Sequence, residues 1–196
     1  NGYEVRAAGV PFEKISFENI GFINLPTENF IYIDGCEFDQ LNIENCLFDL
    51  ENPTNVMIIA YGMGNFNFIK NTIQLDSDYE DMALIVVAGD VQGTVQNNIL
   101  NSVSAIVCES SSLVNANMNY WGTNEPLDIN KNGLNIQNIV VAQSSIDSDE
   151  VMAGDEVTVT VDFNNLLDIS SGEITKQTDL IQDDITVRFK ANGEFT

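Results

Sequence analysis

The sequence has 196 residues, of which 44% are hydrophobic, so it can bury a core and is not expected to be disordered as a whole. Its 30 acidic residues against 7 basic residues give a net charge of −23, which excludes nucleic acid and anionic lipid headgroups as expected partners. The absence of histidine excludes a Ser-His-Asp triad, a Cys-His dyad and a histidine-containing metal site.

The cysteines and the apolar runs set further limits. Cys36, Cys46 and Cys108 show no CxxC spacing, so they indicate neither a disulfide framework nor a zinc site, although one Cys36–Cys46 bridge is compatible with the sequence. No apolar run approaches the length of about 18 residues that a membrane-spanning helix needs. The abrupt start and the strand-like end favour a fragment of a longer protein.

In chain order, weak repeats are the main signal. Segments 15–22, 41–48, 66–73, 93–100 and 113–120 alternate apolar and polar residues. Their equivalent positions lie 26, 25, 27 and 19 residues apart, at Ile20, Cys46, Asn71, Asn98 and Asn117. A second family of strand-like runs, 30–33, 56–59, 83–87 and 105–108, precedes the first family in phase.

Such repeats are too short to fold alone and need stacked neighbours. The sequence therefore predicts an all-β fold, a right-handed parallel β-helix. Stacking would align Asn71, Asn98 and Asn117 in an inner asparagine ladder, which would satisfy buried amides. It would also form an aliphatic ladder from Ile31, Ile58, Ile85 and Val107. An antiparallel sandwich is the competing interpretation, but the near-constant spacing of paired strands favours the β-helix.

The repeats cease near Asn119-Tyr-Trp-Gly-Thr-Asn-Glu-Pro126. This stretch resembles the NxWWG-type element that closes the β-helical region in large adhesin-like surface proteins of methanogenic archaea, which have bacterial relatives. Tyr120 departs from the resemblance, because the family more often has a second tryptophan there. We expect Trp121 to cap the open end of the core rather than to stack on a ligand, since large aromatic residues mostly serve burial.

The resemblance implies a polar spacer, a strand and then immunoglobulin-like domains. Strand-like stretches follow in that order at 135–143, 154–163 and 185–189. The predicted domains are the C-terminal coils and cap of the β-helix (1–126), a linker with one strand (127–150) and a partial immunoglobulin-like β-sandwich (151–196).

Catalysis is not expected. The predicted β-helix contains only Arg6, Lys14 and Lys70 as basic residues, and Lys70 is interpreted as an outward, solvated side chain. The acids Asp34, Asp39, Glu44 and Asp49 lie in adjacent strands or turns but match no hydrolase pattern. We therefore predict that the chain is not an enzyme.

Calcium is the one cofactor that the sequence suggests. Asp76, Asp78, Glu80 and Asp81 crowd a loop between coils, and 147–150 is a second acidic cluster. Calcium binds six to eight oxygen ligands, which carboxylates supply well. A solvated acidic loop is the alternative interpretation at both places.

The resemblance implies a secreted, extracellular adhesin-like module on the cell surface, in which a β-helical scaffold binds carbohydrate or a cell-surface protein. Nucleic acid and membrane contact are not expected within this chain. Exposed loops such as 61–64 or 76–81 are the suggested contact points. The alternative is the C-terminal part of a polysaccharide-active β-helix enzyme, related to pectate lyases or glycoside hydrolases.

Overall fold

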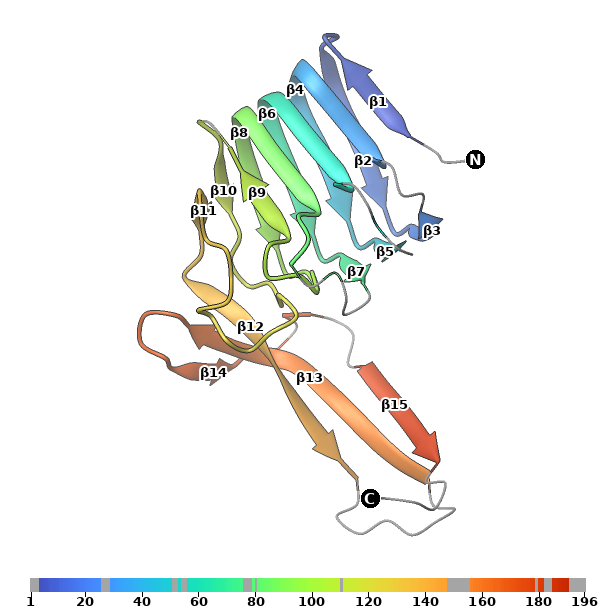
Figure 1. Cartoon of the computed structure of the whole chain (residues 1–196), viewed down its shortest axis with the longest axis vertical. Coiled ribbons are helices and arrows are strands. Elements are labelled where there is room, and N and C mark those ends of the chain that lie inside the picture. The colour runs from blue at the N-terminus through green and yellow to red at the C-terminus, as the bar shows by residue number, and fades with distance from the viewer. Residues whose placement is uncertain are drawn as a thin grey trace.

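A computed structural model describes residues 4–25, 29–50, 53, 56–75, 79, 81–109, 111–147, 156–178, 180–181 and 185–190. Regular structure in these ranges consists of β-strands, arranged as a coiled body with a separate sheet at one end (Figure 1). No helix that could span a membrane occurs among them.

The coiled body is a parallel β-solenoid of about three turns, which confirms the all-β, parallel β-helical prediction at this level. Its larger sheet, sheet A, has the order β1-β4-β6-β8-β10-β11, with β2 also paired to β4 and β9 to β8. The strands are β1 (Val5–Ala8), β2 (Phe12–Glu18), β4 (Ile31–Glu44), β6 (Ile58–Ile69), β8 (Ile85–Gln96), β9 (Ile106–Cys108), β10 (Leu113–Asn115) and β11 (Leu134–Asn135).

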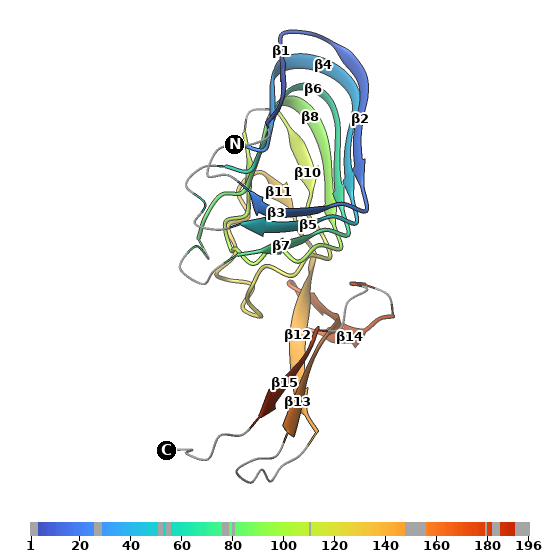
Figure 2. The same cartoon turned by 90° about the vertical axis from the view of Figure 1, so that its right-hand side faces the viewer.

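A smaller parallel sheet, sheet B, closes the first three coils. It consists of β3 (Gly21–Leu25), β5 (Leu47–Leu50) and β7 (Thr72–Gln74). Figure 2 shows β4, β6 and β8 curving round the coil, with the strands of sheet B across its base. All the pairs within sheets A and B are parallel, as stacking of equivalent strands requires.

The long strands β4, β6 and β8 each join two runs that the sequence suggested as separate strands. The corner between the two halves falls at Gly62 of β6 and Gly89 of β8, which pair with each other. Gly89 has a φ of 88°, and a Cβ there would lie 2.3 Å from the carbonyl oxygen of Gly62. The corner therefore requires glycine, and it lets one strand turn without losing its hydrogen-bonded neighbours.

Aliphatic side chains stack through the core as predicted, except in the last rung. Ile31, Ile58 and Ile85 are in register and fully buried. Ile85 then pairs with Ile106, so the prediction of Val107 for this rung was wrong. Side chains alternate between the two faces of a strand, so this shift of one residue places Val107 on the outer face.

An inner asparagine ladder is present. The Oδ1 atom of Asn71 accepts the N–H of Cys46 (2.8 Å), and the Oδ1 atom of Asn98 accepts the N–H of Asn71 (2.7 Å). The next rung is Asn119, whose Oδ1 atom accepts the N–H of Asn98 (3.0 Å). The prediction of Asn117 as the third rung was therefore wrong, because the last step spans 21 residues rather than 19.

An antiparallel sheet of four strands, sheet C, follows the solenoid. Its order is β12-β13-β14, with β15 also paired to β13. The strands are β12 (Asn138–Ile146), β13 (Glu156–Asp168), β14 (Ile174–Lys176) and β15 (Ile185–Lys190). An immunoglobulin-like fold needs two packed sheets. The described residues after 137 form only sheet C, so the prediction of an immunoglobulin-like domain stays untested.

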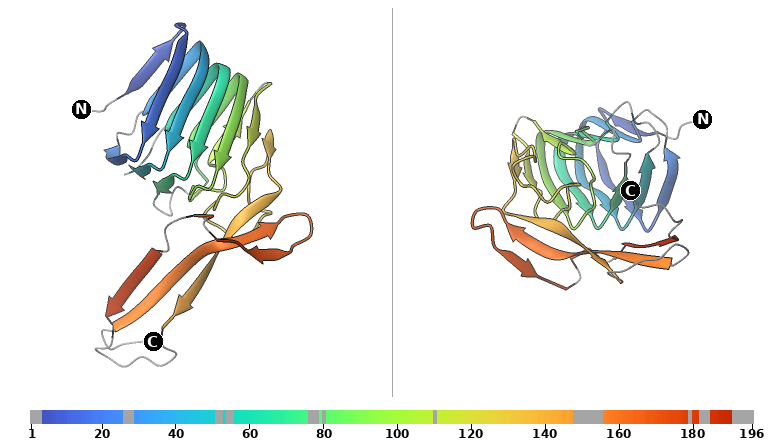
Figure 3. Two further views of the ribbon diagram at one scale, coloured as in Figure 1. Left: turned by 180° about the vertical axis from the view of Figure 1, so that it is seen from behind. Right: turned by 60° about the horizontal axis from the view of Figure 1, so that its bottom comes forward.

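Sheet C lies against the last coils of the solenoid (Figure 3). Ile139 and Val141 of β12, together with Leu167 of β13, belong to the core cluster of the solenoid. Val140 and Phe163 belong to a smaller cluster, which also includes Ile99 of the solenoid. The sheet therefore covers apolar surface that the last coil would otherwise expose.

Candidate functional site

The stretch Asn119–Pro126 is the junction between the solenoid and sheet C. Asn119 forms the last rung of the ladder, and Trp121 is fully buried in the solenoid core, as expected for a cap. Tyr120 contacts the ring of Phe163 edge-on, with centroids 5.0 Å apart. Burial raises the pKa of the Tyr120 hydroxyl.

Two asparagines near this stretch hold the backbone of β12. The Oδ1 atom of Asn117 accepts the N–H groups of Gln137 (2.6 Å) and Asn138 (3.0 Å). The side chain of Asn124 bonds both the N–H (2.8 Å) and the C=O (2.9 Å) of Ala142. The stretch Asn119–Pro126 therefore has a structural role, because its residues join the solenoid to sheet C.

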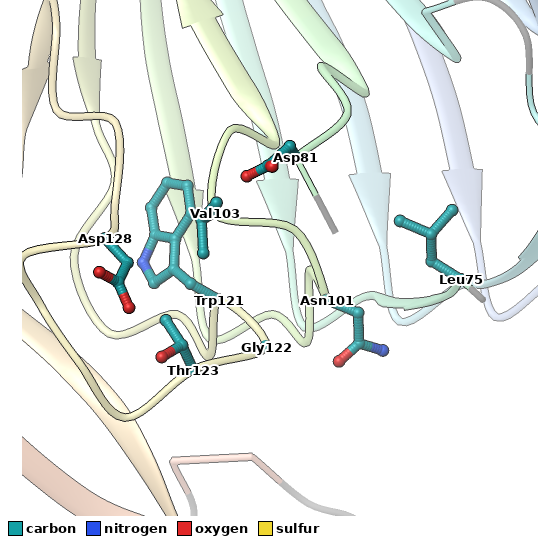
Figure 4. A pocket seen from close by; sticks show the side chains of 8 residues that line it. All are labelled: Leu75, Asp81, Asn101, Val103, Trp121, Gly122, Thr123 and Asp128. Atoms are coloured by element: carbon teal, nitrogen blue, oxygen red, sulfur yellow. The ribbon is translucent and has the colours of Figure 1, made fainter. Parts of the chain in front are cut away.

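A cavity of about 660 Å³ lies beside this junction (Figure 4). Loops from three successive coils bring its walls together. It is lined by Leu75, Asp81, Asn101, Val103, Trp121, Gly122, Thr123 and Asp128. Figure 4 shows the carboxylates of Asp81 and Asp128 on either side of the Trp121 indole in that view.

Polar groups of five residues line the cavity, namely Asp81, Asn101, Trp121, Thr123 and Asp128. Asn101 donates its amide to the carbonyl of Ile73 (2.8 Å), and the hydroxyl of Thr123 accepts the N–H of Glu125 (3.0 Å). Both carboxylates are on exposed residues. The Nε1 atom of Trp121 is buried without a hydrogen-bond partner within the described residues. Asp81 and Asp128 are the ionisable side chains of its lining.

The suggested calcium loop is described only in part. Asp81 lines the cavity, whereas Asp76, Asp78 and Glu80 lie outside the described residues. Asp147 of the second cluster accepts the N–H of Thr158 (3.0 Å), and 148–150 also lie outside. Among the residues that the structure does describe, no three Asp, Glu, Cys or His side chains gather as a metal site.

The other sequence-based candidates are spread around the coils. Asp34, Asp39 and Glu44 follow one another along β4, and Asp49 lies in β5 of the other sheet. Lys70 is exposed at the turn after β6, as interpreted from the sequence. Cys36, Cys46 and Cys108 are free, so the compatible Cys36–Cys46 bridge is not formed.

The outer surface of sheet A is the feature that sequence reasoning missed. On its first half, an apolar row runs from strand to strand in register through Tyr32, Ile59, Val86 and Val107, all half-buried. The guanidinium of Arg6 lies 4.8 Å from the centre of the Tyr32 ring at the start of this row. Tyr61 and Met63 are 46% and 51% exposed beside it.

On the second half of sheet A, two outward rows consist of amides and hydroxyls, which we call the amide stripe. One row is Gln40, Asn65 and Gln92, and the other is Ser16, Asn42, Asn67, Thr94 and Asn115. Lys14 and Leu113 lie at the two ends of the first row, and Asn135 continues the second. The polar residues that alternate with apolar residues in each repeat were the signal that could have revealed these rows, because they face outward when the apolar residues face the core.

Electrostatic shifts in sheet C accompany local hydrogen bonds within β13 and in the turn after it. The N–H of Asn164 lowers the pKa of Asp162, aided by Lys176 at 3.2 Å. The hydroxyl of Ser170 lowers the pKa of Asp168 in the turn that leads to β14. Asp162 thus satisfies an N–H group at the irregularity within β13, and Asp168 satisfies N–H groups of the turn after β13.

Comparisons with known proteins give no match to a family model, to a curated protein or to a solved structure. The resemblance of Asn119–Pro126 to adhesin-like surface proteins therefore rests on the sequence alone.

Proposed function

We propose that this chain is a non-catalytic, adhesin-like binding module of an extracellular cell surface, in which the solenoid is a stiff scaffold for glycan or protein partners. The proposal keeps the narrower expectations of a right-handed coil and an immunoglobulin-like second domain. A right-handed coil fits the strong preference for right-handed connections between parallel strands of one sheet.

The observation that carries the proposal is the outer surface of sheet A, which no other strand of the described residues covers. Parallel sheets are normally covered on both faces. Here the inner face is buried, whereas Tyr61 and Met63 on the outer face are about half exposed. Apolar and uncharged side chains in register on an open face of a chain with net charge −23 are typical of an interaction surface.

Stiffness of the scaffold supports the same proposal. Successive coils are joined by backbone hydrogen bonds along β4, β6 and β8 and by the buried asparagine ladder. A surface built on such strands keeps its side chains in fixed register, so little conformational entropy is lost when a partner binds.

The acids of β4 lack the arrangement that glycoside hydrolysis needs. Glycoside hydrolysis requires two carboxyl groups facing the same bond. Asp34, Asp39 and Glu44 follow one strand along the coil instead. The experiment below therefore tests whether the chain acts on polysaccharides as an enzyme or only binds them.

The test is retention without product release. The purified chain is passed over neutral polysaccharides, uronate polymers and mucin glycans with calcium present, and is mixed with intact microbial cells. We expect retention on at least one polymer or cell type, with no new reducing ends and no unsaturated uronate. Product release that disappears when Asp81 or Asp128 is replaced by asparagine would overturn the non-catalytic proposal, and absence of any retention would overturn the binding role.

A further inference from the structure

The amide stripe differs from the surfaces that flank it. Its positions alternate along each strand with inward residues such as Leu41, Phe66 and Val95, which are fully buried. The row on one side carries Glu18 and Glu44, and the row on the other carries Glu37 and Asp90 with Met63 between them. Within the two rows themselves Lys14 is the only charged residue.

The stripe is also partly ordered before any ligand binds. Asn67 donates its amide to the Oδ1 atom of Asn42 (2.9 Å), and Asn42 donates to the Oε1 atom of Gln40 (3.2 Å). Within the described part of the chain, the side chains of Gln92 and Thr94 make no hydrogen bond, so their polar atoms are free to bind a ligand. A fixed array with unused donors and acceptors is suited to a polar ligand, because less side-chain entropy is lost on contact.

We propose that the amide stripe binds an uncharged polysaccharide chain that lies across the strands, along the axis of the solenoid. Amides and hydroxyls both donate and accept hydrogen bonds, as sugar hydroxyls do. Equivalent side chains recur at the strand separation of about 4.8 Å, so a polymer of repeated units meets the same groups on each coil. This inference rests on the proposed binding function, for which it names the ligand class and the surface.

Other ligand classes fit the stripe less well. The flanking carboxylates and the net charge of −23 repel nucleic acid and acidic glycans. The cores of protein–protein interfaces are enriched in aromatic residues, methionine and arginine, and the two rows have none of these. The exposed apolar residues at their margin are Leu113 at the end of the first row and Met63 in the neighbouring row, where Glu37 and Asp90 flank it, so a lipid or apolar partner fits less well than a polar one.

The decisive variant combines Gln92→Glu with Thr94→Val. Neither side chain forms a hydrogen bond with another described residue, so the thermal unfolding midpoint should not change. The matched control combines Gln74→Glu with Thr72→Val, the same two changes on the outward face of β7 in sheet B. A third variant, Tyr61→Ala, alters the neighbouring apolar half of sheet A.

Retention of the full chain is measured on neutral polymers such as glucans, mannans and xylans, and on uronate polymers as a charged comparison. We expect retention on a neutral polymer, weakened about tenfold in the stripe variant through lost hydrogen bonds and added charge, and unchanged in the control. If retention of the stripe variant is unchanged, or if only Tyr61→Ala loses retention, the amide stripe is not the binding surface. Either result leaves the proposed binding function standing. Retention on uronates or cells only overturns the ligand class, and no retention anywhere overturns both proposals.

Discussion

Asparagines at the turns of the solenoid occupy two kinds of position that differ in what their side chains do. Asn98 is fully buried and bonds to the coils on both sides, whereas Asn97 precedes it with a φ of 59°. The Oδ1 atom of Asn97 is buried without a hydrogen-bond partner in the described part of the chain. Asn98 and Asn97 therefore allow the contribution of a ladder asparagine to stability to be compared directly with that of a turn asparagine.

Replacing Asn98 with alanine should lower the free energy of unfolding by about 3 kcal/mol, since buried groups of Asn71 and Phe68 would lose their partner and Asn119 would keep only the backbone N–H of residue 98. Asn97→Gly should change it by less than about 1 kcal/mol, because glycine adopts a positive φ easily and no bond is removed. Urea denaturation followed by circular dichroism measures both. Equal effects of the two substitutions would show that the ladder contributes no more than an ordinary turn residue.

The sequence predicted Asn71 and Asn98 correctly but could not select the third rung. Asn115, Asn117 and Asn119 alternate with Ala116 and Met118, so strand periodicity places all three asparagines on the same side. The choice is made by the turn, where Met118 adopts a φ of 59° immediately before Asn119. Such a backbone conformation in methionine is fixed by tertiary packing and leaves no mark in a residue pattern.

Packing between neighbouring strands sets which residues the solenoid tolerates on its inner face. Phe12 of β2 and Phe38 of β4 stack with ring centroids 5.2 Å apart. The next residue in register is Gly64 of β6, and the ring of Phe38 occupies the space where its side chain would be. The large side chain of Phe38 on one coil is thus accommodated by a glycine on the next coil.

Gly64→Ala should destabilise the chain by about 3 kcal/mol, because a Cβ would lie 2.0 Å from the carbonyl oxygen of Phe38. Gly21→Ala is the matched control in β3, where nothing lies within 4 Å, and should change stability by less than about 1 kcal/mol. Thermal unfolding of both variants checks the contrast. A Gly64→Ala protein as stable as the control would mean that β4 and β6 can separate locally at little cost.

The expected strand families were correct in position but not in extent. The sequence suggested two short strands in each repeat, and the structure joins them in β4, β6 and β8. Glycine at the corner looked like a strand break in the pattern, since glycine is depleted in strands. Only the neighbouring coil shows that the backbone remains paired through the corner, because that pairing is a contact between residues far apart in sequence.

At the scale of the whole molecule, the solenoid and sheet C share apolar cores. Tyr120 reaches from the last coil to Phe163 of β13, while Ile139 of β12 enters the solenoid core. The two parts should therefore stabilise each other, and the junction should be the place where they can be uncoupled.

Tyr120→Ala should weaken sheet C selectively, by about 2 kcal/mol, through loss of the aromatic pair and its burial. Hydrogen exchange measured by mass spectrometry should show faster exchange in β13 with little change in β4 and β6. Tyr32→Ala is the control, since Tyr32 lies on the outer surface of sheet A, away from sheet C. A uniform increase of exchange over the whole chain would instead indicate a single cooperative unit.

The sequence by itself determined the parallel solenoid and much of its inner ladders, including Ile31, Ile58, Asn71 and Asn98, because stacked coils repeat a local pattern along the chain. It also indicated the burial of Trp121. Only the tertiary structure decided that Ile106 and Asn119 fill the last rungs, that sheet C covers the final coil, and that the outer side chains form apolar and amide rows. These features depend on register between residues 20 to 30 apart, and a slip of one residue exchanges the inner and outer faces of a strand.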